Sequence, residues 1–508
     1  MAERSVWAVD AAYPVGAIDP RLYGSFVEHM GRCVYSGLFE PSHPSADENG
    51  FRTDVLDLVR ALGVTTVRYP GGNFVSGYRW EDGVGPVADR PRRVDLAWGS
   101  TETNRFGLNE FIDWSRLASV EPMMAVNLGT RGIDDARRLV EYCNHPGGTE
   151  LSDLRRAHGH AAAHDIRFWC VGNEMDGPWQ IGALDARAYG RLARETTKAM
   201  RWAHGGLRGV DGRHWSDGSS PGGLTLAACG SSLREMETYA RWEYDVLDEC
   251  FEVIDIISLH TYFRNPTGDA GDFLANIDGL DAYLGEVAAI ADAVAATRRS
   301  SKRIMLSLDE WNVWYKAGDV RDHLPEGFPE APRLIEEVYD VKDALLVGGA
   351  LITLLNHADR VKSACLAQLV NVIAPILTEP GGAAWTQTIF HPFALAARHG
   401  RGETLRAAHV GGAALDLAVT RDGGAMAAFV LNRDLAAPCE LDLSPRGFDA
   451  ALAVEDATVL HHDDLEGTNG ADHRSLEPAT LDGVRVLDGT LRATLPPASW
   501  SVIRLQVR

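Results

Sequence analysis

The chain has 508 residues, 45% of them hydrophobic, which is enough for two domains with a large apolar core. Its 49 basic and 71 acidic residues give a formal charge of -22, and this excess argues against nucleic acid or an anionic membrane surface as a partner, because both bind basic patches. No apolar run reaches the roughly 18 residues of a membrane span, so the composition favours a soluble protein with a neutral substrate.

The N-terminus and the cysteines indicate the same compartment. The opening residues MAERSVWAVDAAYP lack an apolar core after a basic start, so we expect no secretory signal. The seven cysteines are odd in number and have no CxxC spacing. Cys170, Cys229 and Cys365 lie in apolar runs, where free buried thiols are expected. Both features favour a reducing cytoplasm.

Apolar segments alternate with helix-like segments over most of the chain. The segments with the pattern of buried strands are 22–29, 64–72, 121–129, 166–174, 224–230, 254–262, 303–311 and 362–371. Amphipathic segments between them, such as 54–63, 107–119 and 185–205, predict helices. This order predicts an α/β fold, a (β/α)8 TIM barrel with insertions. A doubly wound open sheet is the alternative, although its nucleotide-binding version would carry a GxGxxG or GxxxxGK[ST] loop, which the sequence lacks.

From about residue 395 the pattern changes to alternating apolar and polar residues with Gly, Asp and Pro turns, which is typical of antiparallel strands. We expect a C-terminal β-sandwich of jelly-roll type, to which the opening segment adds a strand. The predicted domains are a barrel over 17–385 and a sandwich over 1–16 plus 386–508, packed tightly because no low-complexity linker separates them. The run His461 to Asp464 is expected to be a solvated turn, the alternative being a metal site.

Two glutamates stand at the ends of predicted buried strands. Glu174 follows the apolar run 166–171, and Glu310 follows the run 304–308. A charged side chain in such a place is costly unless it has a role there. Two carboxylates are what a glycoside hydrolase needs, one as proton donor and one as nucleophile. The alternative is that both belong to structural ion pairs.

Further polar residues lie where the other predicted strands end. In a barrel enzyme the carboxyl ends of the strands face the active site. The polar set at these ends is Glu28, Arg68, Asn73, Asn127, Asn173, Glu174, His260, Tyr262, Glu310 and Gln368. Tryptophans near these ends are expected to offer faces to sugar rings, the alternative being simple packing; they are Trp98, Trp179, Trp311 and Trp314.

Several segments together resemble a known family. They are LYGSFVEHMGRCVYSGLFEP, RYPGGNF, GNEMDGPWQ, SLHTYF and LDEWNVWY, and the likeness runs over nearly the whole chain. In this order they resemble the α-L-arabinofuranosidases of glycoside hydrolase family 51, which belong to the barrel hydrolases with catalytic glutamates on strands 4 and 7. The resemblance implies an exo-acting, retaining enzyme that removes terminal non-reducing α-L-arabinofuranosyl residues from oligosaccharides derived from arabinan or arabinoxylan. It also implies no cofactor, no metal and a homohexamer.

The resemblance assigns a role to each matching residue. Glu174 resembles the general acid/base and Glu310 the nucleophile, while Arg68 resembles the arginine that lies close to the nucleophile. The remaining residues resemble substrate contacts: Asn173 for the 2-hydroxyl, Glu28 and Asn73 for the outer hydroxyls, Gln368 for a further sugar contact, His260 and Tyr262 for support of the carboxylates, and Trp98 and Trp179 beside the leaving group.

Two other functions stay open on the sequence. One is another retaining hydrolase of the same clan, an endoglucanase or a β-xylosidase; Glu28 and Asn73 favour a small furanose pocket over an open cleft. The other is a non-catalytic sugar-binding protein, against which stands the intact pair of Glu174 and Glu310, because a binding protein gains nothing from a buried acid/base pair.

Overall fold

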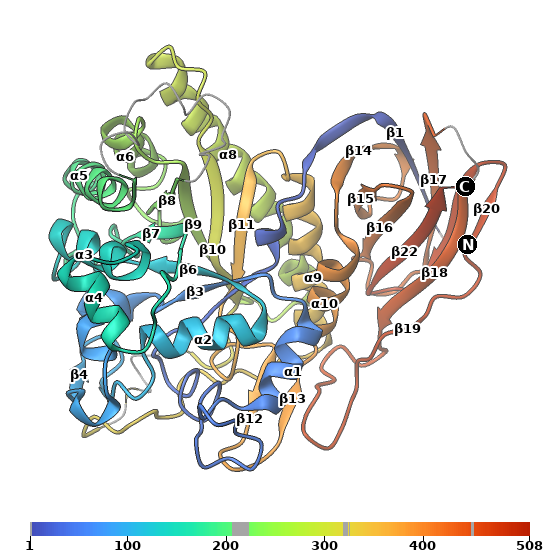
Figure 1. Ribbon diagram of the computed structural model, residues 1–508. Coiled ribbons are helices and arrows are strands. Elements are labelled where there is room, and N and C mark those ends of the chain that lie inside the picture. Colours follow the sequence, from blue (N-terminus) through green and yellow to red (C-terminus); the bar gives the residue numbers. More distant parts are fainter. Residues whose placement is uncertain (1–2, 206–222, 319–323, 325, 449–451, 508) are drawn as a thin grey trace.

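The computed structural model describes residues 3–205, 223–318, 324, 326–448 and 452–507, and its larger part is a closed barrel of eight parallel strands (Figure 1). Each strand overlaps one of the eight predicted segments, and the closure excludes the open doubly wound sheet. The barrel strands, in chain order, are β2 (Gly24–Phe26), β3 (Thr66–Tyr69), β6 (Glu121–Ala125), β7 (Phe168–Val171), β8 (Thr225–Ala228), β9 (Ile256–Phe263), β10 (Met305–Val313) and β11 (Val361–Leu366).

Helices cover the barrel, and their sequences show why they form. In α1, Val55, Leu56, Val59 and Leu62 are buried on one face, and the helix ends at Gly63, whose φ of 79° suits a residue without a Cβ atom. The helices predicted over 54–63, 107–119 and 185–205 are confirmed as α1, α2 and α5. The helices are α1 (Thr53–Leu62), α2 (Leu108–Ala118), α3 (Ile133–Asn144), α4 (Glu150–Ala157), α5 (Ala186–Gly205), α6 (Arg241–Cys250), α7 (Ala270–Leu274), α8 (Asn276–Thr297), α9 (Val341–Asn356) and α10 (Phe390–His399).

The second part of the chain is a ten-stranded sheet, in the order β19-β18-β22-β16-β15-β14-β1-β17-β21-β20. The opening strand β1 pairs antiparallel with β14, as expected of an added strand, and parallel with β17. β18 and β20 touch although they lie near opposite ends of this order, so the sheet folds into two layers around an apolar core. The strands are β1 (Glu3–Ala17), β14 (Glu403–Gly412), β15 (Asp416–Asp422), β16 (Ala425–Asn432), β17 (Cys439–Arg446), β18 (Leu452–His461), β19 (Ala479–Thr480), β20 (Arg485–Leu487), β21 (Thr490–Leu495) and β22 (Ser499–Val507).

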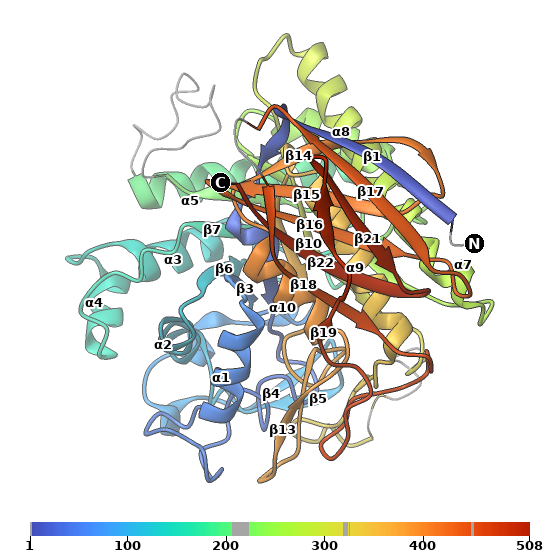
Figure 2. The ribbon, with the colours of Figure 1, turned by 90° about the vertical axis from the view of Figure 1, so that its right-hand side faces the viewer.

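The barrel and the sheet share a continuous core, as the lack of a linker predicted. α9 and α10 lie between the two parts in Figure 1, and Figure 2 shows the sheet in front of them. α9 is buried from Val341 to Leu355, which explains why its sequence is almost entirely apolar from Ala344 to Leu355. On β16, Phe429 packs toward the barrel core while Val430 packs into the core of the sheet, because successive strand residues face opposite sides.

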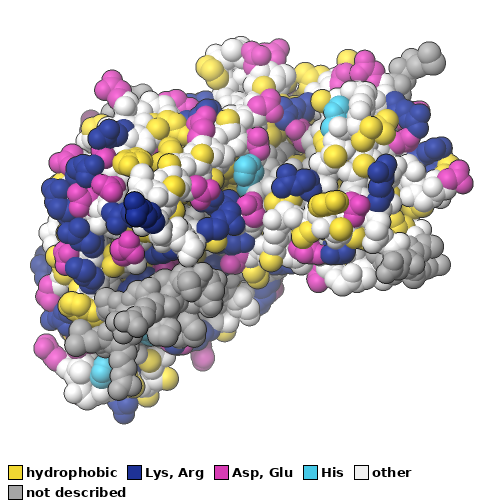
Figure 3. All heavy atoms as spheres, turned by 90° about the horizontal axis from the view of Figure 1, so that it is seen from above, with side chains coloured by type: hydrophobic (Ala, Val, Ile, Leu, Met, Phe, Trp, Pro, Cys, Tyr) yellow, Lys and Arg dark blue, Asp and Glu magenta, His cyan; other side chains and the backbone are white. Residues whose placement is uncertain are grey.

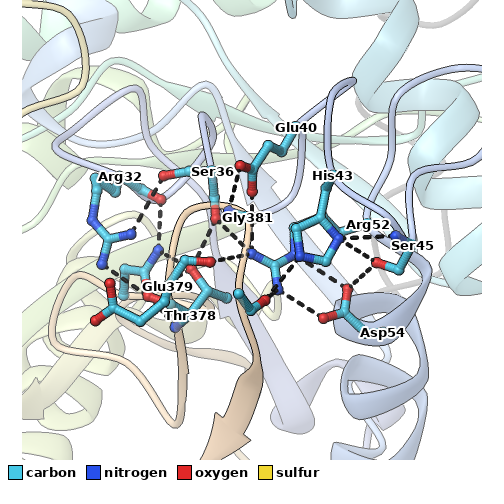
Figure 4. Close-up of polar contacts among 12 residues, drawn as sticks. Arg32, Ser36, Glu40, His43, Ser45, Arg52, Asp54, Thr378, Glu379 and Gly381 are labelled. Atoms are coloured by element: carbon cyan, nitrogen blue, oxygen red, sulfur yellow. Dashed lines mark hydrogen bonds and ion pairs between the residues drawn. The ribbon is translucent and has the colours of Figure 1, made fainter.

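Long loops and two hairpins extend from the carboxyl ends of the barrel strands. The hairpins are β4 (Arg93–Asp95) with β5 (Ser100–Glu102), and β12 (Ile376–Thr378) with β13 (Ala384–Thr386). Figure 4 shows how Arg52, a fully buried residue, joins the loop after β2 to the second hairpin. Its guanidinium donates to the carbonyl oxygens of Ser36, Glu379 and Gly382 and to the carboxylates of Glu40 and Asp54. This network holds the loop after β2 against the β12–β13 hairpin.

The surface and the cysteines agree with the composition. On the face seen in Figure 3, basic and acidic side chains are interspersed, so the excess of acidic residues is not gathered there into one patch. Within the described ranges, no helix is both long and apolar enough to cross a membrane. All seven cysteines are buried and unpaired, which confirms the prediction for Cys170, Cys229 and Cys365. The His461 to Asp464 run lies where β18 ends, and the Asp463 side chain is fully exposed there.

Candidate active site

Glu310 stands in β10, the seventh barrel strand, and its carboxylate is held from two sides. Arg68 Nη1 donates to Oε1 at 2.6 Å, and the Tyr262 hydroxyl donates to Oε2 at 3.0 Å. Glu310 is 5% exposed and Arg68 is 1% exposed, so this is a buried ion pair. A carboxylate with a guanidinium and a hydroxyl directed at its two oxygens is stabilised in its ionised form.

Glu174 follows β7, the fourth barrel strand, and differs from Glu310 in its surroundings. Its φ of 43° lies in the left-handed region, which is unusual for a residue with a side chain and is typical of functional sites. Oε1 lies 3.0 Å from His260 Nδ1, and Oε2 accepts a hydrogen bond of 2.6 Å from Trp179 Nε1. Burial and the charge of Glu310 raise the pKa of Glu174, against the two hydrogen bonds that favour its ionised form.

His260, on β9, lies between the carboxylates. Its Nδ1 is 3.0 Å from Glu174 Oε1 and 3.5 Å from Glu310 Oε2, and its Nε2 is 3.2 Å from Asp309 Oδ1. Burial alone would lower the pKa of His260, but the surrounding negative charges outweigh burial and raise it to about 10. These charges favour the imidazolium form of the ring.

Arg68 also organises the amide side chains of the site. Its Nη2 donates to Asn173 Oδ1 at 2.7 Å, and Asn173 Nδ2 in turn donates to Asn73 Oδ1 at 3.2 Å. The guanidinium carbon lies 5.0 Å from the centre of the Phe26 ring, an attractive cation–π distance. The chain of contacts therefore orients both amides relative to Glu310.

Glu28 forms another wall of the site. Its Oε1 accepts hydrogen bonds from the Phe74 backbone N–H at 2.9 Å and from Trp98 Nε1 at 2.8 Å, and its Oε2 accepts one from Gln368 Nε2 at 3.2 Å. Burial raises the pKa of Glu28 to about 8, although these donors act in the opposite direction. Glu28, Trp98 and Gln368 are thus brought together as expected.

The glycines of RYPGGNF allow the loop after β3 to cross the site. Gly71 has a φ of 118°, and a Cβ atom there would lie 2.3 Å from Glu28 Cγ. A Cβ atom on Gly72 would lie 3.0 Å from Glu310 Oε1. Only glycine permits so close an approach, so the motif has a physical reason in this fold.

The spacing of Glu174, His260 and Glu310 would also suit a cation, because one ligand atom from each lies within 4.8 Å of the others. Both ring nitrogens of His260 already face carboxylate oxygens, however, and a proton on each nitrogen satisfies them. The Arg68 guanidinium neutralises further negative charge. The chemistry of this group is therefore that of a proton-linked cluster rather than of a metal centre.

The structure also separates residues that the strand pattern put together. Asn127 donates to the Tyr78 carbonyl oxygen and to the Thr130 hydroxyl and accepts from the Thr130 N–H, so its hydrogen bonds lie outside the catalytic cluster. Trp311 is completely buried, so it offers no face to a sugar, while Trp314 packs edge-on against Tyr262 at 5.3 Å. Trp179, which is 44% exposed, does lie beside the acid/base candidate.

Asp309 and Cys170 are members of the site that the sequence reasoning did not assign. Cys170 Sγ lies 3.4 Å from Arg68 Nε and 3.5 Å from Asp309 Oδ2. The signal for Asp309 was its place directly before Glu310, at the end of the run 304–308. Nothing in the sequence around Cys170 distinguishes it from an ordinary core thiol.

The fold and the site together define a class of enzyme. Oxygens of the Glu174 and Glu310 carboxylates lie within 4.8 Å of each other, at the carboxyl ends of the fourth and seventh strands of a (β/α)8 barrel. One carboxylate is paired with Arg68 and the other has a raised pKa, which suits the division of roles that a barrel glycoside hydrolase needs.

Comparison with known proteins specifies the family. The family "Alpha-L-arabinofuranosidase 1 domain" matches residues 58–201, and "Alpha-L-arabinofuranosidase C-terminal domain" matches residues 309–499. The chain is 50% identical to an intracellular exo-alpha-(1->5)-L-arabinofuranosidase of Streptomyces lividans, over 98% of this chain and 75% of that protein. It is 45% identical to an exo-alpha-(1->6)-L-arabinofuranosidase of Bifidobacterium longum, over 99% and 98% of the two chains.

A solved structure agrees over the full length. The family 51 alpha-L-arabinofuranosidase from Bifidobacterium longum superposes with a TM-score of 0.90 at 42% identity, and the match covers 99% of this chain and 100% of that one. This chain belongs to the α-L-arabinofuranosidases of glycoside hydrolase family 51.

Proposed function

We propose that this protein removes terminal non-reducing α-L-arabinofuranosyl residues from oligosaccharides derived from arabinan or arabinoxylan, by a retaining double displacement. The observation that carries the proposal is the close approach of the Glu174 and Glu310 carboxylates, with oxygens within 4.8 Å. Retaining glycosidases have carboxyl groups about 5–5.5 Å apart, whereas inverting enzymes need about 6.5–9.5 Å to admit a water molecule.

In the first step Glu310 acts as the nucleophile. Arg68 and Tyr262 hold its carboxylate ionised and oriented, so that one oxygen attacks the anomeric carbon of the furanose. Glu174, whose pKa is raised, gives its proton to the leaving oxygen as the glycosidic bond breaks. The product of this step is a glycosyl ester on Glu310 and an ionised Glu174.

In the second step Glu174 acts as the base. It takes a proton from water, and the hydroxyl attacks the anomeric carbon from the face that the leaving group vacated. The ester bond to Glu310 breaks, and both carboxyls return to their first protonation states. Two inversions give net retention, and the steps need only two carboxylates and water.

The other site residues are largely buried around the catalytic pair and suit a single sugar. Glu28, Asn73, Asn173 and Gln368 offer acceptors and donors to hydroxyls, and Trp98 is locked in place by its bond to Glu28. Trp179 is exposed beside Glu174, where the leaving group would lie. This enclosure favours an exo-acting furanosidase over an endoglucanase or a β-xylosidase.

Compartment and assembly are part of the same proposal. The Streptomyces lividans relative is named intracellular, and all seven cysteines of this chain are buried and free, both of which support a cytoplasmic enzyme. A homohexamer follows from the family resemblance. Relatives are named for both (1->5) and (1->6) linkages, so the linkage preference is best measured with defined arabino-oligosaccharides.

The test uses 4-nitrophenyl α-L-arabinofuranoside. Glu310→Ala is expected to lose activity by about 10⁴-fold or more, because no glycosyl-enzyme can form. Glu174→Ala is expected to be glycosylated still by substrates with good leaving groups, and azide is expected to accelerate its slow second step. Glu243→Gln, a change at a fully buried glutamate outside the pocket, serves as the control and keeps its activity.

An NMR spectrum recorded early in the reaction completes the test. The α anomer of the released sugar is expected first, and early appearance of the β anomer would overturn the retaining mechanism. Hydrolysis of β-xylosides or glucans without hydrolysis of the arabinofuranoside would favour the other clan members. Binding of arabinose with no turnover would favour a non-catalytic protein.

A further inference from the structure

Asp309 is a buried carboxylate for which the proposed reaction has no step. It is 1% exposed and directly precedes the nucleophile Glu310. Its Oδ1 lies 3.2 Å from His260 Nε2, and its Oδ2 lies 3.6 Å from Arg68 Nε. A buried charge is costly to keep, so its place in this cluster calls for a physical reason.

An irregularity of β10 brings Asp309 into the site. Ser307 pairs with Ser258 of β9, but the next pair is Glu310 with His260, so β10 has one residue more than β9 over this stretch. Successive side chains of a regular strand face opposite sides, and a bulge redirects one of them. Asp309 and Glu310 therefore both reach the His260 ring, from its two nitrogens.

The contacts of His260 suit its doubly protonated form. A neutral imidazole has a proton on only one nitrogen, but both nitrogens of His260 face carboxylate oxygens within 3.2 Å. The doubly protonated ring donates to both oxygens. The carboxylates around the ring come from β10 and from the loop after β7. Arg68 of β3 contacts Asp309 and Glu310, and Tyr262 of β9 donates to Glu310. Cys170 of β7 lies against Asp309 as well.

The charge on the catalytic pair moves during the reaction, but its sum does not change. Before glycosylation Glu310 is ionised and Glu174 holds the proton. In the glycosyl-enzyme Glu310 is a neutral ester and Glu174 is ionised. The pair therefore carries one negative charge in both states, and His260 Nδ1 lies 3.0 Å from one carboxylate and 3.5 Å from the other. One fixed cation at this point is matched to both states.

We propose that Asp309 is a positioning residue that holds His260 as a cation between Glu174 and Glu310, so that a single positive charge serves both steps of the reaction. Asp309 acts through His260 and does not touch the substrate. The inference rests on the proposed double displacement, because the transfer of charge from Glu310 to Glu174 belongs to that mechanism. It assigns a role to a residue outside the set of catalytic and sugar-binding side chains described above.

The first measurement needs no substitution. The ring signals of His260, assigned by comparison with His260→Gln, are followed by NMR from pH 5 to pH 8 in the unaltered enzyme. We expect the ring to stay doubly protonated over this range. A His260 that titrates within it, or that is neutral throughout, would overturn the proposal without any reference to substrate turnover.

The second measurement uses Asp309→Asn, which keeps the size and removes the charge. The rates of glycosylation and of deglycosylation are both expected to fall, by about 10²-fold, with KM changed only a few-fold. The ring of His260 is expected to titrate below pH 8 in this variant, and the basic limb of the pH profile is expected to move to lower pH. A role in packing alone would change stability and leave the pH profile in place.

Asp442→Asn is the matched control, because it removes a buried, arginine-paired carboxylate from β17, outside the barrel, and leaves Asp309 unchanged. It is expected to keep the wild-type pH profile and the wild-type His260 signals. Loss of only the first step in Asp309→Asn, or a His260 that stays protonated in that variant, contradicts the proposal. Failure of the wild-type enzyme to hydrolyse arabinofuranosides would instead contradict the proposed function, so the two results are distinct.

Discussion

Arg52, just before α1, and Arg68, in barrel strand β3, are both buried arginines, yet their surroundings differ in kind. Arg52 donates to three backbone carbonyl oxygens and to the carboxylates of Glu40 and Asp54, whose side chains are 14% and 31% exposed. Arg68 meets Asp309 and Glu310, whose side chains are only 1% and 6% exposed. The Arg52 network thus includes partly exposed carboxylates, whereas the carboxylates that Arg68 contacts are buried.

The difference shows which property of a buried charge marks a functional site. Around Arg68 and His260 stand three carboxylates, those of Asp309, Glu310 and Glu174, so two cations face three acids and one proton must be shared. At Arg52 each donor has a fixed acceptor, and Figure 4 shows a network that ties two segments together. Burial of a cation is common to both regions, and an excess of buried acids is particular to the catalytic one.

The largest effect is expected from Arg68→Met. Without the guanidinium, Asp309 and Glu310 lack their counter-charge, and an uncompensated buried charge costs about 3–5 kcal/mol. The nucleophile then lacks its counter-charge and one of the two donors that orient it, so kcat/KM is expected to fall by about 10³-fold or more. Steady-state kinetics over a range of pH measures this, and an active Arg68→Met enzyme would show that another group keeps Glu310 ionised.

Arg52→Met tests the structural network around Arg52. The free energy of unfolding is expected to fall by about 3 kcal/mol, because the carbonyl oxygens and the carboxylates of the network lose their donors. The activity of the folded fraction is expected to stay within about threefold, since no catalytic contact is removed. Denaturant unfolding measures the loss of stability, and kcat of the same preparation measures the activity. A large loss of kcat at full folding would show that the Figure 4 network also shapes the pocket.

Tyr262→Phe tests a single hydrogen bond of the catalytic cluster. The hydroxyl donates to Glu310 Oε2 at 3.0 Å, and a hydrogen bond to a charged group contributes about 1.5–3 kcal/mol. We expect kcat to fall by about 10- to 100-fold with little change in stability. Tyr239→Phe, which removes a hydroxyl that donates to the exposed Glu286, is the control and is expected to leave kcat unchanged.

The smallest effect is expected from Trp179→Phe, which keeps an aromatic face and removes the N–H bonded to Glu174 Oε2. That hydrogen bond favours the ionised carboxylate and so lowers the pKa of Glu174. Its loss raises the pKa of Glu174 further, and the acid form then persists to higher pH. The basic limb of kcat/KM is expected to shift upward by less than about one pH unit. A downward shift would mean that the indole N–H does not act on this carboxylate in the working enzyme.

Much of the fold and of the site could be predicted from local patterns. The eight barrel strands and the alternation of the C-terminal strands follow from short-range burial periodicity, which a sequence carries directly. Glu174 and Glu310 were visible because a charge at the end of an apolar run is conspicuous. Arg68, His260 and Tyr262 were placed correctly because parallel strands end at one face of a barrel, so strand ends that are distant in sequence meet there.

The tertiary structure alone decided which neighbouring residues face the site. The sequence put Asp309, Glu310 and Trp311 in one strand, but only the bulge in β10 turns Asp309 toward His260, and only the register buries Trp311 completely. The register of a strand depends on its pairing with strands far away in the chain, and a shift by one residue reverses every side chain. The sequence thus determined which residues carry the chemistry, while pairing between distant segments decided which of them touch.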